Sequence, residues 1–290
     1  MKKLIAALLI AVLAIPTFAA CSTGGDFVFD SQKDVAVISR EDGSGTRGAF
    51  IELFEIEQKN DDGTRKDLTT KEAIIAKQTD VMITNIVGNK YAIGYISLGS
   101  LNNTVKALQV EGVPPTPENV KNGTYQIARP FNIATKGEVE GLTKDFIDFI
   151  LSADGQAVVA SSYISVDENA PPYTVNKLSG KVVVAGSSSV NPIMEKLKEA
   201  YLEVNPDAVV EIQMSDSSAG ITGVIDGTCD IGMASRDLKE SELEQLTSTQ
   251  IALDGIAVII NNENPSDNMT KEQIRAIFIG EAVTWSEAIQ

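Results

Sequence analysis

Histidine is absent from this 290-residue chain, and cysteine occurs only twice. Without histidine, neither a Ser-His-Asp nor a Cys-His catalytic arrangement can form, and most zinc sites lose a principal ligand. One cysteine, Cys21, lies near the N-terminus, and the other, Cys229, lies in the sequence Gly-Thr-Cys-Asp-Ile. Because no base is available to activate it, Cys229 is predicted to be a small buried hydrophobic residue rather than a nucleophile. No metal and no cofactor are expected.

Basic residues are also scarce, with 24 Lys and Arg against 40 Asp and Glu, so the formal net charge is −16. Nucleic acid demands a basic face and is therefore excluded as a partner. The same acidity repels small anions at long range, so an anion site must depend on local donors. Hydrophobic residues make up 43% of the chain, and its length suffices for two lobes, each with its own core.

The N-terminus has the pattern of an export signal. Two lysines precede the apolar run 4–15, which is too short and wrongly flanked for a transmembrane helix. Residues 1–20 are therefore predicted to be a signal peptide, and the small residues before Cys21 resemble a lipoprotein signal, in which this cysteine is lipidated. Phe18 stands where that signal prefers Leu, so cleavage without a lipid is the alternative. The predicted location is the outer face of the cell membrane, as an extracytoplasmic anchored lipoprotein, with a periplasmic or secreted protein as the alternative.

Three short clusters rich in Ser, Gly and Thr each follow an expected strand and precede an expected helix. They are residues 40–47 (REDGSGTR), 186–189 (GSSS) and 216–220 (DSSAG). A helix start offers unpaired N–H groups and the positive end of the peptide dipoles, and small residues let an oxyanion come close. Together with an arginine, three such clusters predict a shared pocket for a tetrahedral anion.

The first cluster supplies the predicted cation. The planar fork of Arg40 suits two oxygens of one oxyanion, and Asp42 is predicted to hold that fork in place. The Ser44 and Thr46 hydroxyls and the Gly45 N–H are predicted to converge on the same ligand.

The other clusters supply further donors. The predicted oxyanion donors there are Ser188, Ser189 and Ser217. Asp216 either accepts the proton of a monohydrogen phosphate or caps the helix 219–225, and the cap is slightly favoured. Arg236 either adds a second positive charge at the pocket or forms a surface ion pair with Asp237 or Glu240.

Two other classes of function stay open. Residues 43–48 match the G-x-G-x-x-G pattern of dinucleotide-binding enzymes, but an all-polar stretch follows the expected helix where a second strand is needed. An enzyme without histidine, acting on a phosphorylated or dinucleotide ligand through this loop, is therefore the first alternative. A surface adhesin or scaffold with no ligand is the second.

Strands and helices are expected to alternate. Apolar strands are predicted at 34–39, 91–96, 181–185 and 209–213, with helices between them, which indicates an α/β chain with mainly parallel sheets. Residues 69–78 are predicted to be helical. A capping box at 270–273 predicts the start of the helix 274–279.

Five segments resemble signatures of the extracytoplasmic phosphate-binding proteins that serve high-affinity phosphate ABC transporters. They are 182–190, 217–220, 230–236, 251–258 and 39–47. The resemblance covers nearly everything after residue 30, but in permuted order, because the family carries the Gly186 loop near its N-terminus and the Arg40 loop near its middle. The former termini are then joined near 175–180, as in a circular permutation.

The resemblance implies a two-lobed, periplasmic-binding-protein-like (type II) α/β fold with a hinge, circularly permuted. Lobe one is expected to comprise residues 132–256, and lobe two residues 26–131 completed by 257–290. Two segments are expected to cross between the lobes, near 129–135 and near 253–258.

The resemblance also implies that the cleft binds inorganic phosphate, which a monomer delivers to the membrane permease of an ABC transporter. Ser188, Ser189 and Ser217 are expected on one wall, opposite Arg40 and residues 44–46. Some family members use a buried aspartate to accept the proton of the ligand, and Arg236 stands at that position here. Discrimination between phosphate and sulfate therefore depends on Asp216 or on another carboxylate.

Overall fold

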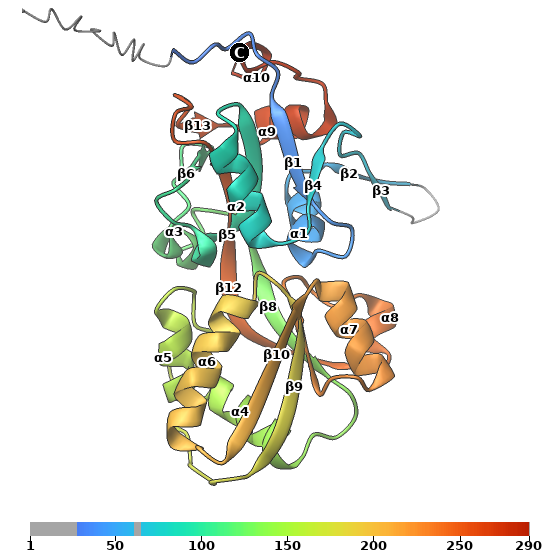
Figure 1. Ribbon diagram of the computed structural model, residues 1–290, viewed down its shortest axis with the longest axis vertical. Helices are drawn as coiled ribbons and strands as arrows, with labels where there is room; N and C mark the ends of the chain where they lie inside the picture. Colours follow the sequence, from blue (N-terminus) through green and yellow to red (C-terminus); the bar gives the residue numbers. More distant parts are fainter. Residues whose placement is uncertain (1–27, 61–64, 290) are drawn as a thin grey trace, which may run out of the picture.

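The computed structural model describes residues 28–60 and 65–289, and it has two lobes stacked along its longest axis (Figure 1). The strands are β1 (Ala36–Arg40), β2 (Glu57–Lys59), β3 (Arg65–Asp67), β4 (Ile74–Ala76), β5 (Ala92–Ser97), β6 (Lys106–Ala107), β7 (Gln109–Val110), β8 (Ala128–Thr135), β9 (Gly180–Ser187), β10 (Ala208–Ser215), β11 (Ile231–Ala234), β12 (Thr247–Ile260) and β13 (Asn268–Met269). The helices are α1 (Gly45–Leu53), α2 (Thr79–Gly88), η1 (Leu98–Ser100), α3 (Pro117–Lys121), α4 (Gly141–Leu151), α5 (Ala153–Ala160), α6 (Asn191–Val204), α7 (Ser217–Asp226), α8 (Glu240–Leu243), α9 (Lys271–Ile279) and α10 (Trp285–Ala288).

One nine-stranded sheet runs through both lobes in the order β10-β9-β11-β8-β12-β5-β1-β4, with β6 also paired to β12. The flanks are parallel, because β1 pairs in parallel with β4 and β5, and β9 does so with β10 and β11. Around β8 and β12 every pairing is antiparallel. The prediction of mainly parallel sheets is therefore correct only for the flanks, since a strand that returns between lobes must run against its neighbours.

The strands β8 and β12 pass through the narrow waist between the lobes (Figure 1). β12 pairs with β8 over its first part and with β5 over its second part, with a register shift between Gln250 and Ala252. Buried apolar side chains form one cluster from residues 37–127 and 256–288, and two further clusters from residues 131–252. The predicted lobe boundaries stay a prediction, and this division of the core is compatible with them.

The helix predicted at residues 69–78 is wrong. Ile74–Ala76 form the edge strand β4, which pairs in parallel with β1, and helix α2 begins only at Thr79. Ile74 and Ile75 are about half exposed, so their apolar side chains do not mark a helix face turned toward the core. Pairing with β1 therefore outweighs local helical preference in this segment.

No helix in the described ranges is long and apolar enough to cross a membrane. The predicted signal peptide, residues 1–20, and the predicted lipid attachment at Cys21 lie outside the described residues. Cys229 lies inside them and is buried, as predicted, and burial raises the pKa of its thiol.

Candidate anion site

Arg40, at the end of β1, is 1% exposed and is held on several sides. Its Nε and Nη2 donate to the two carboxylate oxygens of Glu41, at 2.9 and 2.8 Å, and Nε also donates to the Ala76 carbonyl. Nη2 reaches the Ser188 hydroxyl at 3.0 Å, so this arginine connects the loop after β1 with the loop after β9. Its backbone N–H donates to the buried Tyr95 hydroxyl, whose pKa is raised by burial.

The Nη1 atom of Arg40 is buried and has no hydrogen-bond partner. A buried donor on a charged group that stays unpaired costs roughly 1–3 kcal/mol or more. The two carboxylate bonds fix the orientation of the guanidinium plane, so Nη1 stays directed away from Glu41. An oxygen of a bound anion would satisfy this donor.

Helix α1 begins beside Arg40. The Ser44 side chain caps it by accepting the Arg47 N–H, which leaves the Gly45 and Thr46 amides in the first turn without intrahelical partners. The Thr46 hydroxyl is fully buried and lies 2.8 Å from the Ser189 hydroxyl, which belongs to the loop after β9. The first cluster thus meets the second directly, as the sequence predicts.

The loop that carries Ser187, Ser188 and Ser189 turns from β9 into α6, and all three side chains are buried. The Ser187 hydroxyl accepts the Ser189 N–H and donates to the Ser235 hydroxyl at 2.9 Å. Ser188 also lies 3.4 Å from the hydroxyl of Thr79, the first residue of α2. Hydroxyls from both lobes therefore surround the Arg40 guanidinium.

Ser217 opens helix α7 and is completely buried. Its hydroxyl accepts the Ser235 N–H at 3.1 Å and lies 3.3 Å from the Ser235 hydroxyl. Asp216 caps the helix by accepting the Ala219 N–H at 2.8 Å, which is the role favoured from the sequence. The strands β1 and β4 of one lobe run opposite to β9 and β10 of the other, so the carboxyl ends of both strand pairs point toward the waist. The starts of α1, α2 and α7 therefore converge there.

The two lobes touch across this site, and two glycines permit the contact. The Ser218 N–H donates to the Gly43 carbonyl at 3.2 Å, and α1 and α7 lie on opposite sides of the waist (Figure 1). A Cβ atom on Gly45 would lie 2.5 Å from the Ser217 hydroxyl and 2.8 Å from the Ser235 hydroxyl. Both distances are too short for a real contact, so a side chain at position 45 would force Ser217, Ser235 or the lobes themselves to shift.

Asp42 and Arg236 form ion pairs with other residues than those predicted from the sequence. Asp42 does not hold the Arg40 fork, because its carboxylate is exposed and pairs with Arg47 at 2.7 Å. Glu41 holds that fork instead, since its side chain turns inward along the end of β1. Arg236 forms a two-bond ion pair with Glu242, at 2.8 and 2.9 Å, rather than the predicted pair with Asp237 or Glu240. A second positive charge for the ligand from Arg236 stays a prediction.

Sequence reasoning missed four residues that lie in the site: Glu41, Thr79, Ser187 and Ser235. Thr79 was missed because the incorrect helix was predicted to end at residue 78, whereas Thr79 is the first residue of α2. Ser235 directly follows the buried strand β11 and precedes the charged Arg236. A useful signal for Thr79, Ser187 and Ser235 is a short polar residue at the end of a buried strand or at the start of a helix.

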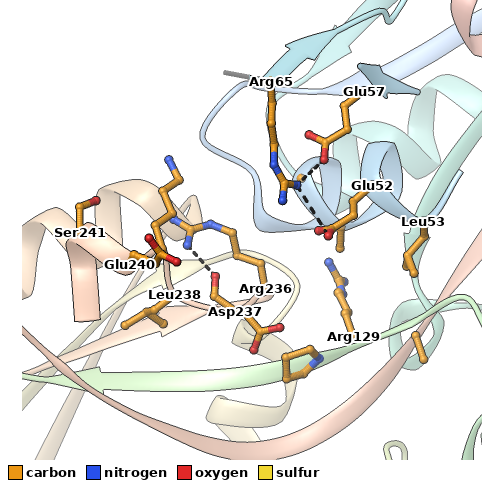
Figure 2. A pocket seen from close by; sticks show the side chains of 15 residues that line it. Glu52, Leu53, Glu57, Arg65, Arg129, Arg236, Asp237, Leu238, Glu240 and Ser241 are labelled. Atoms are coloured by element: carbon orange, nitrogen blue, oxygen red, sulfur yellow. Dashed lines mark hydrogen bonds and ion pairs between the residues drawn. The ribbon is translucent and has the colours of Figure 1, made fainter. Parts of the chain in front are cut away.

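A separate cavity of about 1060 Å³ opens beside the site, between α1 and residues 236–241. Figure 2 shows Arg65 beside Glu57 and Glu52 on one wall and Arg236 beside Asp237 on the other. Charges of both signs line this cavity, and Arg65 pairs there with Glu52 and Glu57, unlike the serine-rich anion site. Among the described residues, no group of three or more His, Cys, Asp or Glu could hold a metal ion.

Residues 27–154 and 171–290 match the PBP superfamily domain, and the chain belongs to this superfamily. More narrowly, the "Phosphate-binding protein PstS 2" of Streptococcus agalactiae serotype V is 50% identical over 279 residues, 95% of this chain and 94% of that protein. The crystal structure of a phosphate ABC transporter, phosphate-binding protein from Streptococcus pneumoniae has a TM-score of 0.70 at 45% identity, covering 88% of this chain and 99% of that one. The "Phosphate-binding protein PstS" of Staphylococcus saprophyticus is 36% identical over only 119 residues, 38% of this chain and 37% of that protein. The resemblance seen in the sequence, and the two-lobed fold that it implies, are confirmed.

Proposed function

We propose that this protein binds inorganic phosphate between its lobes and delivers it to a membrane ABC importer. The observation that carries the proposal is the buried Arg40 guanidinium, which contacts Ser188 of the opposite wall and keeps Nη1 unpartnered. Relatives that match nearly the whole chain are named as phosphate-binding proteins, which is a non-enzymatic role. An enzyme is disfavoured further because β2, which follows α1, joins a separate two-stranded sheet and not the main one that a dinucleotide fold needs.

The proposed ligands come from both walls of the cleft. They are Arg40, the Ser44, Ser188, Ser189, Ser217 and Thr46 hydroxyls, and the Gly45 amide, with Thr79 added from the structure. Micromolar affinity needs about −8 kcal/mol. Hydrogen bonds to a charged group contribute roughly 1.5–3 kcal/mol each, so several of them reach that value after ordering costs.

The proposal extends to location and partners. An exported, monomeric protein anchored through lipidated Cys21 would hold this cleft outside the cytoplasm, next to the permease of the importer. The support is the export pattern of residues 1–20 and the transporter role named for the pneumococcal relative.

We also infer that the segment order is permuted within the wider family. The streptococcal relative is matched over 94% of its length, so it shares the order of this chain, whereas the staphylococcal one is matched over 37%. Partial matching is what a rearranged order produces, because an alignment follows one continuous piece at a time.

Calorimetric titration of phosphate and of sulfate into the wild type and into Arg40→Ala tests the function. Phosphate is expected to bind with 1:1 stoichiometry, and Arg40→Ala is expected to weaken it by at least roughly tenfold, about 1.4 kcal/mol. Arg65→Ala is the matched control, because Arg65 is half exposed and pairs with Glu57 outside the site. Equal affinities of wild type and Arg40→Ala would refute the proposed site, and no heat with phosphate would refute the function.

A further inference from the structure

A buried ion pair lies where the two crossing strands meet. Arg129 on β8 and Asp254 on β12 occupy paired positions of the antiparallel ladder, and Arg129 Nη2 lies 3.2 Å from Asp254 Oδ2. Their side chains are 2% and 1% exposed. Removing two charges from water is costly, so such a pair needs further hydrogen bonds to be tolerated.

Those further bonds lead to the anion site. Arg129 Nη1 donates to the Ser235 carbonyl at 3.0 Å. The same residue, Ser235, donates its N–H to the Ser217 hydroxyl and accepts from the Ser187 hydroxyl. Ser217 Oγ accepts from the Ser235 N–H, so its own proton is available either to the Ser235 hydroxyl or to an oxyanion. A continuous chain of bonds therefore runs from Asp254 through Arg129 and Ser235 to two serines of the site.

The pair also contacts the opposite lobe. Asp254 Oδ1 accepts the Gly99 N–H of η1 at 3.4 Å, and a Cβ atom on Gly99 would collide with the Tyr163 ring. The groups that face Asp254 are thus Arg129 from β8, the Gly99 amide and the Ser97 hydroxyl from β5, and Tyr163 also interacts with it electrostatically. The positive charge of Arg40 also acts on Arg129 and, together with burial, lowers its pKa.

We propose that Arg129 is a positioning residue for anion binding: Asp254 fixes its guanidinium, and Arg129 fixes Ser235 and with it the Ser187 and Ser217 hydroxyls. The inference rests on the proposed phosphate-binding function and adds that affinity depends on an ion pair in the crossing strands. Neither Arg129 nor Asp254 is a proposed ligand of phosphate.

The ionisation state of Asp254 determines in which direction phosphate affinity changes with pH. Burial raises the pKa of Asp254 to about 6, against the opposing effects of Arg129, Ser97 and Gly99. Above that pH the carboxylate is ionised and holds Arg129. As the pH falls through about 6 the carboxyl takes up a proton, and Arg129 loses its counter-charge. Affinity for phosphate should therefore decrease toward lower pH because Asp254 becomes protonated, in addition to any effect of the protonation of phosphate itself.

The test compares the affinity of wild type and Asp254→Asn for phosphate by calorimetry, from about pH 5 to about pH 8. At the alkaline end the variant is expected to bind at least roughly tenfold more weakly, because a neutral amide does not hold the guanidinium. Below about pH 6 the two affinities should converge, since wild-type Asp254 is then protonated as well. The ratio of the two affinities at each pH is free of the titration of phosphate itself, because that titration affects both proteins equally.

Asp145→Asn is the matched control. Asp145 is also a buried carboxylate, and it accepts bonds from Tyr173, Tyr201 and Asn176, but none of these leads to the site. This variant is expected to lose stability while keeping wild-type affinity at every pH. A merely structural role of Asp254 would make both variants behave alike.

The outcomes are distinct. Absence of phosphate binding by the wild type would overturn the proposed function, whereas an Asp254→Asn affinity equal to wild type at every pH would overturn only the positioning role. If Asp254→Asn does not fold, Arg129→Lys replaces it, because lysine retains the charge but not the fork that also reaches Ser235. Weaker phosphate binding by a folded Arg129→Lys supports the proposal, and unchanged binding overturns it.

Discussion

Glu41, not Asp42, is the carboxylate that orients the guanidinium of Arg40. Both residues stand in the same short motif, and their side chains differ by one methylene group. Glu41 is turned inward and accepts two bonds from Arg40, whereas Asp42 is 97% exposed and pairs with Arg47. The two residues differ because the backbone at the end of β1 directs the Glu41 side chain inward and the Asp42 side chain outward.

We expect Glu41→Gln to weaken phosphate binding by roughly tenfold, because one of the two charge-assisted bonds that hold the guanidinium plane is lost. Asp42→Asn is the control and should leave the affinity nearly unchanged, since an exposed pair contributes about 0–1 kcal/mol. Calorimetry on both variants measures this difference. Equal effects of the two substitutions would show that the orientation of Arg40 is not set by Glu41.

Much of the site could be predicted from the chemistry of its individual residues. Arg40, the glycines and the hydroxyl residues follow from what an oxyanion needs, and Arg40, Thr46, Ser188 and Ser189 do meet. The choice between Glu41 and Asp42 was not predictable in this way, because neighbouring carboxylates have equal chemistry and differ only in direction. Thr79 was out of reach because its position depends on where α2 begins.

Helix α1 is the element that sets how closely the lobes approach. Gly45 faces Ser217 and Ser235 across the cleft, whereas at Gly48 a Cβ atom would lie no nearer than 3.9 Å to Arg236. Two glycines three residues apart on the same helix thus differ in what they meet, although their sequence surroundings look alike.

Gly45→Ala is expected to reduce phosphate affinity by at least roughly tenfold, because the added methyl group holds the lobes apart. Its stability should hold or rise, since alanine favours a helix over glycine by about 1 kcal/mol. Gly48→Ala is the control, with the same gain in helix preference and no obstruction. Measuring affinity and thermal unfolding on both separates the two effects, and comparable affinities in the two variants would contradict the steric argument.

Element boundaries with a side-chain cap were predictable. The capping box of Thr270 and Gln273 opens α9, and Asp216 caps α7, as the sequence predicts. Residues 69–78 were predicted incorrectly because β4 is a three-residue edge strand that pairs in parallel with β1. Such pairing is non-local, so the local pattern contains no trace of it.

At the scale of the whole molecule, a strongly acidic protein encloses a site that is nearly neutral. The formal charge of the chain is −16, while the buried Arg40 is already balanced by Glu41. Retention of the ligand then depends on oriented hydroxyls and amides, and the surface charge affects only its approach.

Phosphate affinity is therefore expected to change by less than about twofold when salt is raised from low to near-physiological levels, because buried partners are little screened. The association rate should rise over the same interval, since salt screens the repulsion between ligand and surface. Calorimetry measures the affinity, and rapid-mixing kinetics measures the association rate. A steep loss of affinity with salt would show that unpaired charge, and not oriented dipoles, retains the ion.

The overall topology was predictable only in part. Alternating strands and helices indicated the α/β class, and the family resemblance supplied the two lobes. The antiparallel centre of the sheet was missed because periodicity reports which residues are buried and not which way a neighbouring strand runs.

The shared ladder of β8 and β12 has a mechanical consequence. These two strands are bonded to each other from Thr247 and Thr135 to Gly255 and Ala128, so the lobes cannot separate without flexing that ribbon. Release of a bound ion from between the lobes then requires the backbone of this ribbon to deform. The resistance of this two-stranded ribbon to bending is therefore expected to influence the rate of ion release, in addition to the contacts of the ion itself.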